Sequence, residues 1–389
     1  MSPLRIVVFL VVGGSLLFGA HYYFWARLVR DPVLPAPWSA VASWSLAVLG
    51  VLVLVGAFAS RLAPRAVHSP LLWVAYTWLG VIFFLLLLLG VSDLGRALHF
   101  FGRKIASIDP VDADRRLAIA RIVAGSVGLA ALGLATASVA NALRAVAVKK
   151  IRVPLARLAS SSSGFRIVQL SDIHIGPTIG KEFLETLVAQ VNALEPDVVA
   201  ITGDLVDGSV AAIGPLVAPL AALRAKHGVY FVTGNHEYYS GAPEWVAFLG
   251  TLGVRVLRNE RVAIGGEHGF DLAGIDDWSA HEFGEGHGAN LPRALEGRDP
   301  SRALVLLAHQ PRAIVEAAAL GVCLQLSGHT HGGQIFPWNF MVRLQQPYVA
   351  GLHAHGDSQI YVSSGTGYWG PPMRLGAPAE ITHIEIVPA

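Results

Sequence analysis

A chain of 389 residues is long enough for two or three domains, and its hydrophobic fraction of 53% with a mean hydropathy of +0.52 exceeds that of ordinary soluble enzymes. The net charge of +2, with no basic stripe carrying interleaved aromatic residues, argues against a nucleic-acid partner. The single cysteine, Cys323, excludes an intrachain disulfide.

The excess of apolar residues lies in the first 150 residues. Four segments there are each about twenty residues long and nearly free of charge, which is the length that crosses a hydrocarbon core of roughly 30 Å. They are residues 4–25, 39–59, 71–91 and 117–140. We therefore predict a helical transmembrane domain of four spans over residues 1–150, with buried soluble helices as the alternative for some of them.

The orientation of these spans is less well defined by the sequence. Lys and Arg residues flank the spans in nearly equal numbers on the two sides, so their distribution does not orient the domain. Residues 114–121 resemble a twin-arginine export signal placed before the last span, with an ordinary charged helix end as the alternative. The export interpretation predicts a C-terminal domain on the extracytoplasmic side.

Residues 151–164 contain Pro154 and a serine run, and predict a polar linker, or an edge strand followed by a linker. From residue 165 the apolar pattern alternates strands with amphipathic helices. The strands are 165–170, 198–202 and 229–233, and the helices are 181–194, 213–226 and 243–252. Short strands with few helices then follow, which predicts a second, more antiparallel sheet. They are 254–257, 262–265, 270–275, 303–308, 322–326, 360–363 and 381–387.

Side chains that bind metal ions follow five of the predicted strands. They are Asp172 and His174, Asp204 and Asp207, Asn235 with His236 and Glu237, His309, and His329 with His331. Open α/β sheets bind ligands at the carboxyl ends of their strands, so these residues predict one common site. Carboxylate, amide and imidazole ligands without a thiolate suit Mn²⁺, Fe or Zn²⁺ and argue against a structural zinc site. Turn aspartates and buried histidines are the alternative.

The motifs Asp172-x-His174, Gly203-Asp204-x-x-Asp207, Gly234-Asn235-His236-Glu237, His309 and Gly328-His329-x-His331 resemble the signature of the calcineurin-like metallophosphoesterases over residues 165–389. Residues 328–335, 364–367 and 371–376 are similar to membrane-anchored bacterial phosphodiesterases, including UDP-2,3-diacylglucosamine pyrophosphatase-like enzymes. The resemblance implies an α/β fold, a four-layer α/β/β/α sandwich after the membrane domain. Together with the four spans predicted from hydropathy, it indicates a multi-pass protein of a bacterial inner or plasma membrane.

The resemblance further implies two divalent metal ions, with Mn²⁺ as the first choice and Fe or Zn²⁺ as alternatives. The ligands would be Asp172, His174, Asp204 and His331 for one ion, and Asp204, Asn235, His309 and His329 for the other. His236 would protonate the leaving oxygen or stabilise the transition state. Asp207 would orient His236 or a ligand, with a plain turn or helix-cap carboxylate as the alternative.

The expected function is a membrane-bound phosphoester hydrolase with a metal-bridging hydroxide as nucleophile, a phosphodiesterase or pyrophosphatase acting on a lipid or lipid-linked substrate. Its expected partners are the lipid bilayer and that substrate. A non-catalytic membrane sensor that retains the fold is the alternative, and a transporter with a regulatory domain is a second.

Several further residues have two open interpretations. Arg374 and Tyr368 either contact a phosphate or pack the last loop. Trp338 and its aromatic neighbours either meet the bilayer or belong to a core. The residues His268, His281, His287, Asp276 and Asp277 are predicted to be solvated in or near a long loop, with the substrate opening as the alternative.

Overall fold

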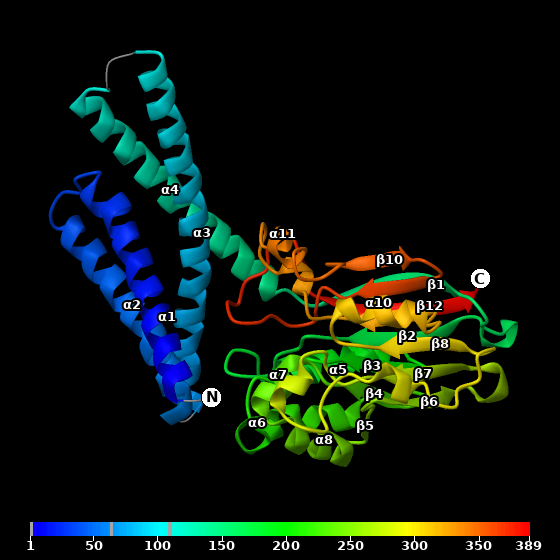
Figure 1. Ribbon diagram of the computed structural model, residues 1–389. Helices are drawn as coiled ribbons and strands as arrows, with labels where there is room; N and C mark the ends of the chain where they lie inside the picture. Colours follow the sequence, from blue (N-terminus) through cyan, green and yellow to red (C-terminus); the bar gives the residue numbers. More distant parts are fainter. Residues whose placement is uncertain (1–2, 63–64, 108–110) are drawn as a thin grey trace. The chain divides into compact units, whose positions relative to one another are not determined.

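The computed structural model describes residues 3–62, 65–107 and 111–389 (Figure 1). The chain divides into two compact units. The first consists of residues 1–140 with residues 370–373, and the second of residues 141–369 and 374–389. Residues 147–155 form a strand of the second unit, so the start of the predicted linker 151–164 belongs to a sheet.

The first unit is helical. Its described elements are α1 Pro3–Trp25, the π-helical segment η1 Ala26–Arg30, α2 Trp38–Leu62, α3 Arg65–Ile105, and α4 Ala113–Ala142, whose last residues belong to the second unit. Asp93 of α3 binds Arg27 at 2.9 Å and accepts a hydrogen bond from Tyr23 at 2.7 Å. This carboxylate joins α3 to η1 and is paired, as a charged group in an apolar helix must be.

Three helices among the described residues are long and apolar enough to cross a membrane. They are Trp38–Gly56, Val67–Ile105 and Ala113–Ala142. The first predicted span, residues 4–25, forms helix α1, but the beginning of this segment lies outside the residues whose side chains the structure describes. The structure therefore supports three candidate spans rather than the predicted four.

The second unit contains two six-stranded sheets. The first has the order β1-β12-β2-β3-β4-β5, with bounds Ala147–Leu155, Glu380–Pro388, Phe165–Leu170, Val198–Thr202, Val229–Val232 and Val254–Val256. The second has the order β10-β11-β9-β8-β7-β6, with bounds Gly351–His355, Ser358–Val362, Leu324–Ser327, Ala303–Leu307, Phe270–Gly274 and Glu260–Ile264.

The second sheet has two antiparallel pairings and the first has one, so the prediction of a more antiparallel second sheet is confirmed, although most of its pairings are parallel. Strands β7, β8, β9 and β11 pair in parallel, and antiparallel pairing occurs at β6–β7 and β10–β11. Parallel pairing needs a long crossover, and the segments that join these four strands are long enough to return the chain to the same end of the sheet. Parallel strands also bring their carboxyl ends to one edge.

Both sheets are buried on two faces. In β3, Val199 and Ile201 face a core shared with helices, whereas Val198 and Ala200 face the core between the two sheets. This alternation is the period of two expected for a strand. A third core lies between the second sheet and its own helices, so the layers follow the order helix, sheet, sheet, helix (Figure 1).

The helices of the second unit are α5 Lys181–Ala193, α6 Val210–Val217, α7 Asn235–Ser240, α8 Ala242–Thr251, α9 Leu291–Ala294, α10 Ile314–Ala319 and α11 Asn339–Val342. The helix predicted over 213–226 ends at Val217 and continues as a 3-10 segment over 218–222, because Pro219 has no amide hydrogen to extend it. Strand β10 was not predicted, since its half-exposed edge position gives no clear apolar pattern.

Trp245 is the main anchor of α8 in the helical core. Its side chain is fully buried and donates from Nε1 to the Gly208 carbonyl at 2.9 Å. We expect Trp245→Ala to lower the free energy of unfolding by about 3–5 kcal/mol, because it leaves a cavity and an unpaired carbonyl. Thermal unfolding of the solubilised protein would measure it. Val315→Ala, at an exposed position of α10, should change stability by no more than about 0.5 kcal/mol.

Candidate metal centre

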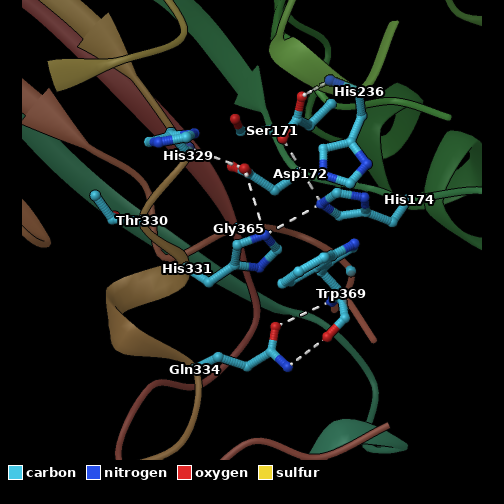
Figure 2. A network of polar contacts seen from close by, with 12 residues as sticks. Ser171, Asp172, His174, His236, His329, Thr330, His331, Gln334, Gly365 and Trp369 are labelled. Atoms are coloured by element: carbon cyan, nitrogen blue, oxygen red, sulfur yellow. Dashed lines mark hydrogen bonds and ion pairs between the residues drawn. The ribbon is translucent and has the colours of Figure 1, made fainter. Parts of the chain in front are cut away.

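The predicted ligand residues come together at the carboxyl ends of strands from both sheets. Asp172 and His174 follow β2, and Asp204 follows β3. Asn235 is the first residue of α7, directly after β4. His309 follows β8, and the pair His329 and His331 follows β9. Figure 2 shows the part of this network that contains Asp172, His174, His236 and His331.

The first cluster consists of Asp172, His174 and His331, whose ligand atoms all lie within 4.8 Å of one another. The Nε2 atoms of His174 and His331 are 3.1 Å apart, and Nε2 of His331 is 3.5 Å from Oδ1 of Asp172. Each side chain is buried. Two imidazole nitrogens that face one carboxylate at this separation form a donor set suited to one cation.

The second cluster consists of Asp204, His309 and His329, again within 4.8 Å. Oδ2 of Asp204 is 3.1 Å from Nε2 of His309 and 3.9 Å from Nε2 of His174, which belongs to the first cluster. Asp204 therefore lies between the two clusters, in the position of a shared carboxylate. Nδ1 of His309 is 2.8 Å from the Thr202 carbonyl, which fixes its hydrogen there and leaves Nε2 to face Asp204.

Several polar atoms of these clusters are buried without a hydrogen-bond partner. They are Oδ2 of Asp172, Oδ1 of Asn235 and Nδ1 of His331. An unpaired buried polar atom costs about 1–3 kcal/mol, and a bound cation would satisfy the two oxygens. The residues of the two clusters therefore fit two divalent cations, and Asn235, the further predicted ligand, has one of the unpaired oxygens.

The backbone at the site is strained. Five residues of the two clusters have left-handed φ angles: Asp172 at 52°, His174 at 55°, Asp204 at 51°, His329 at 71° and His331 at 50°. Residues with a Cβ rarely adopt this conformation, and they cluster at functional sites where it aims a side chain. Here each sharp turn directs a ligand into the centre immediately after its strand.

Two glycines allow the ligand loops to approach each other. A Cβ at Gly234 would collide with the Asp204 carboxylate, and one at Gly328 would collide with Ser171 and the Asp172 carboxylate. Neither glycine can be replaced without moving a ligand. The glycines that precede Asn235 and His329 in the sequence motifs therefore have a steric role.

The carboxylate of Asp207 bonds to two imidazole rings, so Asp207 is more than a plain turn residue. Its Oδ1 is 2.6 Å from Nδ1 of His236 and 3.1 Å from Nδ1 of His174. These bonds leave Nε2 of each ring free to act in the site. The geometry agrees with the predicted orienting role of Asp207 toward His236, and shows that His174 shares the same carboxylate.

The clusters perturb the protonation of His236 and His329 in opposite directions. Burial disfavours the charged form of His236, but the carboxylates of Asp204 and Asp207 outweigh it and raise its pKa to about 9. Burial, with the nearby His309, lowers the pKa of His329 to about 3. The carboxylates beside His236 thus favour its charged, proton-donating form, whereas burial favours the neutral form of His329, which is the form that binds a metal.

Glu237 is the last residue of the motif at residues 234–237, but its role was not predicted from the sequence. Its buried carboxylate accepts hydrogen bonds from the amides of Asp204 at 3.0 Å, Leu205 at 2.8 Å and Gly234 at 2.7 Å. It therefore joins the loop after β3 to the start of α7. The available signal was a Glu three residues into a helix, where it caps the first turn.

We expect Glu237→Ala to destabilise the protein by about 1–3 kcal/mol, because three buried amides lose their acceptor. The thermal unfolding midpoint of the solubilised protein, measured with bound metal, would show the loss. Glu316→Ala, at an exposed position of α10, is the matched control. Equal midpoints for the two variants would contradict the bracing role of Glu237.

Other candidate residues lie outside the clusters. Asp276 pairs with Arg258 at 2.7 Å, and Asp277 accepts from Gln310. Both carboxylates are buried, so the prediction of solvated loop residues was wrong for them. His268 and His281 are exposed, and His287 contacts Arg258.

Arg374 and Tyr368 pack the last loop rather than face the centre. Arg374 is buried and donates to the carbonyls of Gly367 and Ala377, and the Tyr368 hydroxyl donates to Thr178. The structure favours the packing interpretation for both residues.

Two facing mixed sheets that carry paired Asp and His clusters at their strand ends define a metal-dependent phosphoesterase. Comparison with known proteins agrees with this class. The calcineurin-like phosphoesterase family model matches residues 165–333.

Two relatives match almost the whole chain. The chain is 40% identical over 400 residues to a transmembrane protein with metallophosphoesterase domain from Bos taurus, covering 98% of this chain and 89% of that protein. The protein of the same description from Danio rerio is 35% identical over 397 residues, with the same coverage. A metallophosphoesterase of Helicobacter pylori is 43% identical over 225 residues, 57% of this chain and 60% of its own length.

The chain therefore belongs to the calcineurin-like metallophosphoesterases that carry transmembrane helices. The predicted enzyme class and family are confirmed. None of these three relatives bears the name of the UDP-2,3-diacylglucosamine pyrophosphatase-like branch. The vertebrate relatives also have both parts of the chain, so neither that branch nor a bacterial membrane follows from the comparison.

Proposed function

We propose that this phosphoesterase hydrolyses a phosphodiester or pyrophosphate bond of a lipid or lipid-linked substrate. The observation that carries the proposal is the position of Asp204, shared by two buried clusters and adjacent to His236. The amide of His236 donates to Oδ1 of Asp204 at 2.9 Å, so the proton donor and the shared carboxylate form one rigid unit. Two cation sites beside a proton donor suit in-line displacement at phosphorus.

Each protein group has a defined part in this reaction. When bound, two divalent ions, which we propose to be Mn²⁺, would activate a water molecule and neutralise the phosphate oxygens. Asp207 holds Nδ1 of His236, which directs the Nε2 proton toward the leaving oxygen. Asp207 also orients His174.

Two features support an amphiphilic substrate. The same chain carries membrane-spanning helices, so the enzyme works where lipids are present. The second unit also exposes an apolar segment at residues 336–344 that includes Phe336, Phe340 and Leu344. Exposed apolar segments of this kind mark membrane or ligand contacts.

Removal of divalent metal tests the proposed chemistry directly. We expect chelation of the detergent-solubilised protein to abolish hydrolysis of bis-p-nitrophenyl phosphate, and Mn²⁺ to restore it better than Fe²⁺ or Zn²⁺. Saturating metal should also stabilise the protein by about 2.7 kcal/mol at a hundredfold excess over Kd. Metal that stabilises the protein without any hydrolysis would favour the alternative of a non-catalytic sensor.

We also propose an extracytoplasmic position for the second unit, on the basis of the arginine pair at residues 115–116 before the last candidate span. Reporter fusions after Ala159 test it. A periplasmic or extracellular reporter signal supports the export interpretation, and a cytoplasmic signal overturns it.

A further inference from the structure

Two exposed aromatic side chains contact His236, and a third contacts one of them. Tyr239 is 64% exposed and its ring centroid lies 5.2 Å from that of His236. Trp369 is 54% exposed and lies 5.6 Å from His236. Phe283 is 42% exposed and lies 5.6 Å from Tyr239. We call Tyr239, Trp369 and Phe283 the aromatic rim.

The rim is assembled from three separate parts of the chain. Tyr239 follows His236 by three residues on α7, so the two side chains share one helix face. Phe283 ends the 3-10 segment Ala280–Phe283, and Trp369 lies in the loop after β11. Large exposed rings gathered from distant segments beside a reactive group indicate a binding surface rather than scattered surface residues.

Trp369 is held in place by Gln334. The backbone amide of Trp369 donates to Oε1 of Gln334 at 2.9 Å, and Nε2 of Gln334 donates to the Trp369 carbonyl at 2.9 Å. Figure 2 shows both bonds. Gln334 also has a left-handed φ of 50°, and it lies three residues after the candidate ligand His331. The loop that carries the candidate metal ligand His331 therefore also holds Trp369 of the aromatic rim in position.

We propose that the aromatic rim receives an apolar leaving group, and this inference rests on the proposed function. His236 protonates the leaving oxygen, so whatever surrounds His236 surrounds the leaving group. Asp207 occupies the Nδ1 side of the ring, and Tyr239 and Trp369 contact the ring edge-to-face. The group bonded to the departing oxygen therefore meets aromatic surface.

The shared chemistry of the leaving group is an apolar body attached directly to the phosphate oxygen. An aryl ring and the alkyl chain of a lipid both meet this description. In the reaction the bond from phosphorus to the leaving oxygen breaks while one from phosphorus to the water oxygen forms. The leaving oxygen takes the proton of His236, and a proton from the attacking water restores it.

Kinetics with three methyl phosphodiesters would test the rim. The full-length protein with Mn²⁺ is given esters whose second group is p-nitrophenyl, octyl or 2-hydroxyethyl, and the alcohol released from that group is quantified. Wild-type and variant kcat/KM are compared for each ester separately, so the intrinsic reactivity of the ester cancels. We expect Trp369→Ala and Tyr239→Ala to lose roughly tenfold more on the apolar esters than on the hydroxyethyl ester.

Further variants distinguish a loss of packing against the leaving group from a general disturbance of the site. Trp369→Phe retains a ring and is expected to recover most of the lost kcat/KM. Gln334→Ala should show the same selectivity among the esters as Trp369→Ala, but a smaller loss of kcat/KM. Leu352→Ala is the control, because Leu352 is 39% exposed on β10 and belongs neither to the aromatic rim nor to the apolar segment 336–344. Metal content is measured for every variant.

The outcomes separate the two proposals. A loss of kcat/KM on the p-nitrophenyl ester alone would mean that the rim receives an aryl leaving group. A loss on both apolar esters would mean that it also receives a lipid chain. An equal loss on all three esters, or none, overturns the rim and leaves the proposed function intact. A wild-type protein that cleaves no ester overturns the proposed function, and the rim with it.

Discussion

Replacement of Asp204 with asparagine is expected to lower kcat/KM for bis-p-nitrophenyl phosphate by about 10³-fold or more. Oδ2 of Asp204 faces His309 at 3.1 Å and His174 at 3.9 Å, so one carboxylate contributes negative charge to both clusters. Asparagine retains the shape but removes that charge and one of the two anionic oxygens. Steady-state kinetics and the metal content of the purified variant measure the effect.

Two comparison variants make the Asp204 result specific. Asp357→Asn changes an exposed aspartate in the turn between β10 and β11, and activity should stay at the wild-type level. Asp172→Ala removes a ligand of the first cluster alone, so that variant should lose one ion in preference to the other. Asp204→Asn with normal activity, or with metal loss confined to one site, would contradict a shared carboxylate.

The residues that cluster at the candidate site could be selected from the sequence because they lie within a few residues of the ends of apolar strands. The sequence shows where a strand ends, and the end of a parallel strand is where a side chain enters a common site. Asp172, Asp204 and His329 could therefore be selected without knowing which strands are neighbours. Their left-handed backbone angles could not be predicted, because in each case the residue is not a glycine.

The aromatic rim gave no signal in the sequence. Tyr239 and Trp369 are separated by more than a hundred residues, and no spacing or periodicity relates them. Their proximity depends on α7 and the loop after β11 reaching the same edge of the two sheets. Gln334 lies within the family motif at residues 328–335, and its bonds to the Trp369 backbone could not be inferred from that motif.

The sequence did not show how much of the second sheet pairs in parallel. A short buried strand such as β8 is apolar on both faces and looks the same whether its neighbours run parallel or antiparallel. The connections decide the direction, and those of the second sheet contain only short helical turns with weak periodicity. The sparse helical signal therefore did not reveal the three parallel pairings β7–β8, β8–β9 and β9–β11.

Replacement of His236 with alanine is expected to lower kcat by about 10²- to 10⁴-fold while KM and metal content stay close to wild type. The His236 ring belongs to neither of the two clusters of proposed metal ligands. Without it, Asp207 keeps its bond to His174, so the ligands should remain in place. The loss should therefore fall on the chemical step, and single-turnover kinetics would isolate it.

The dependence on the leaving group shows whether His236 acts as a proton donor. A donor matters most when the departing oxygen is basic, so His236→Ala should slow cleavage of an alkyl ester more than that of a p-nitrophenyl ester, whose oxygen departs readily as an anion. His268→Ala, an exposed histidine in the same unit, should leave both rates unchanged. An equal loss on both esters would instead mean that the positive charge of His236 stabilises the transition state without transferring a proton.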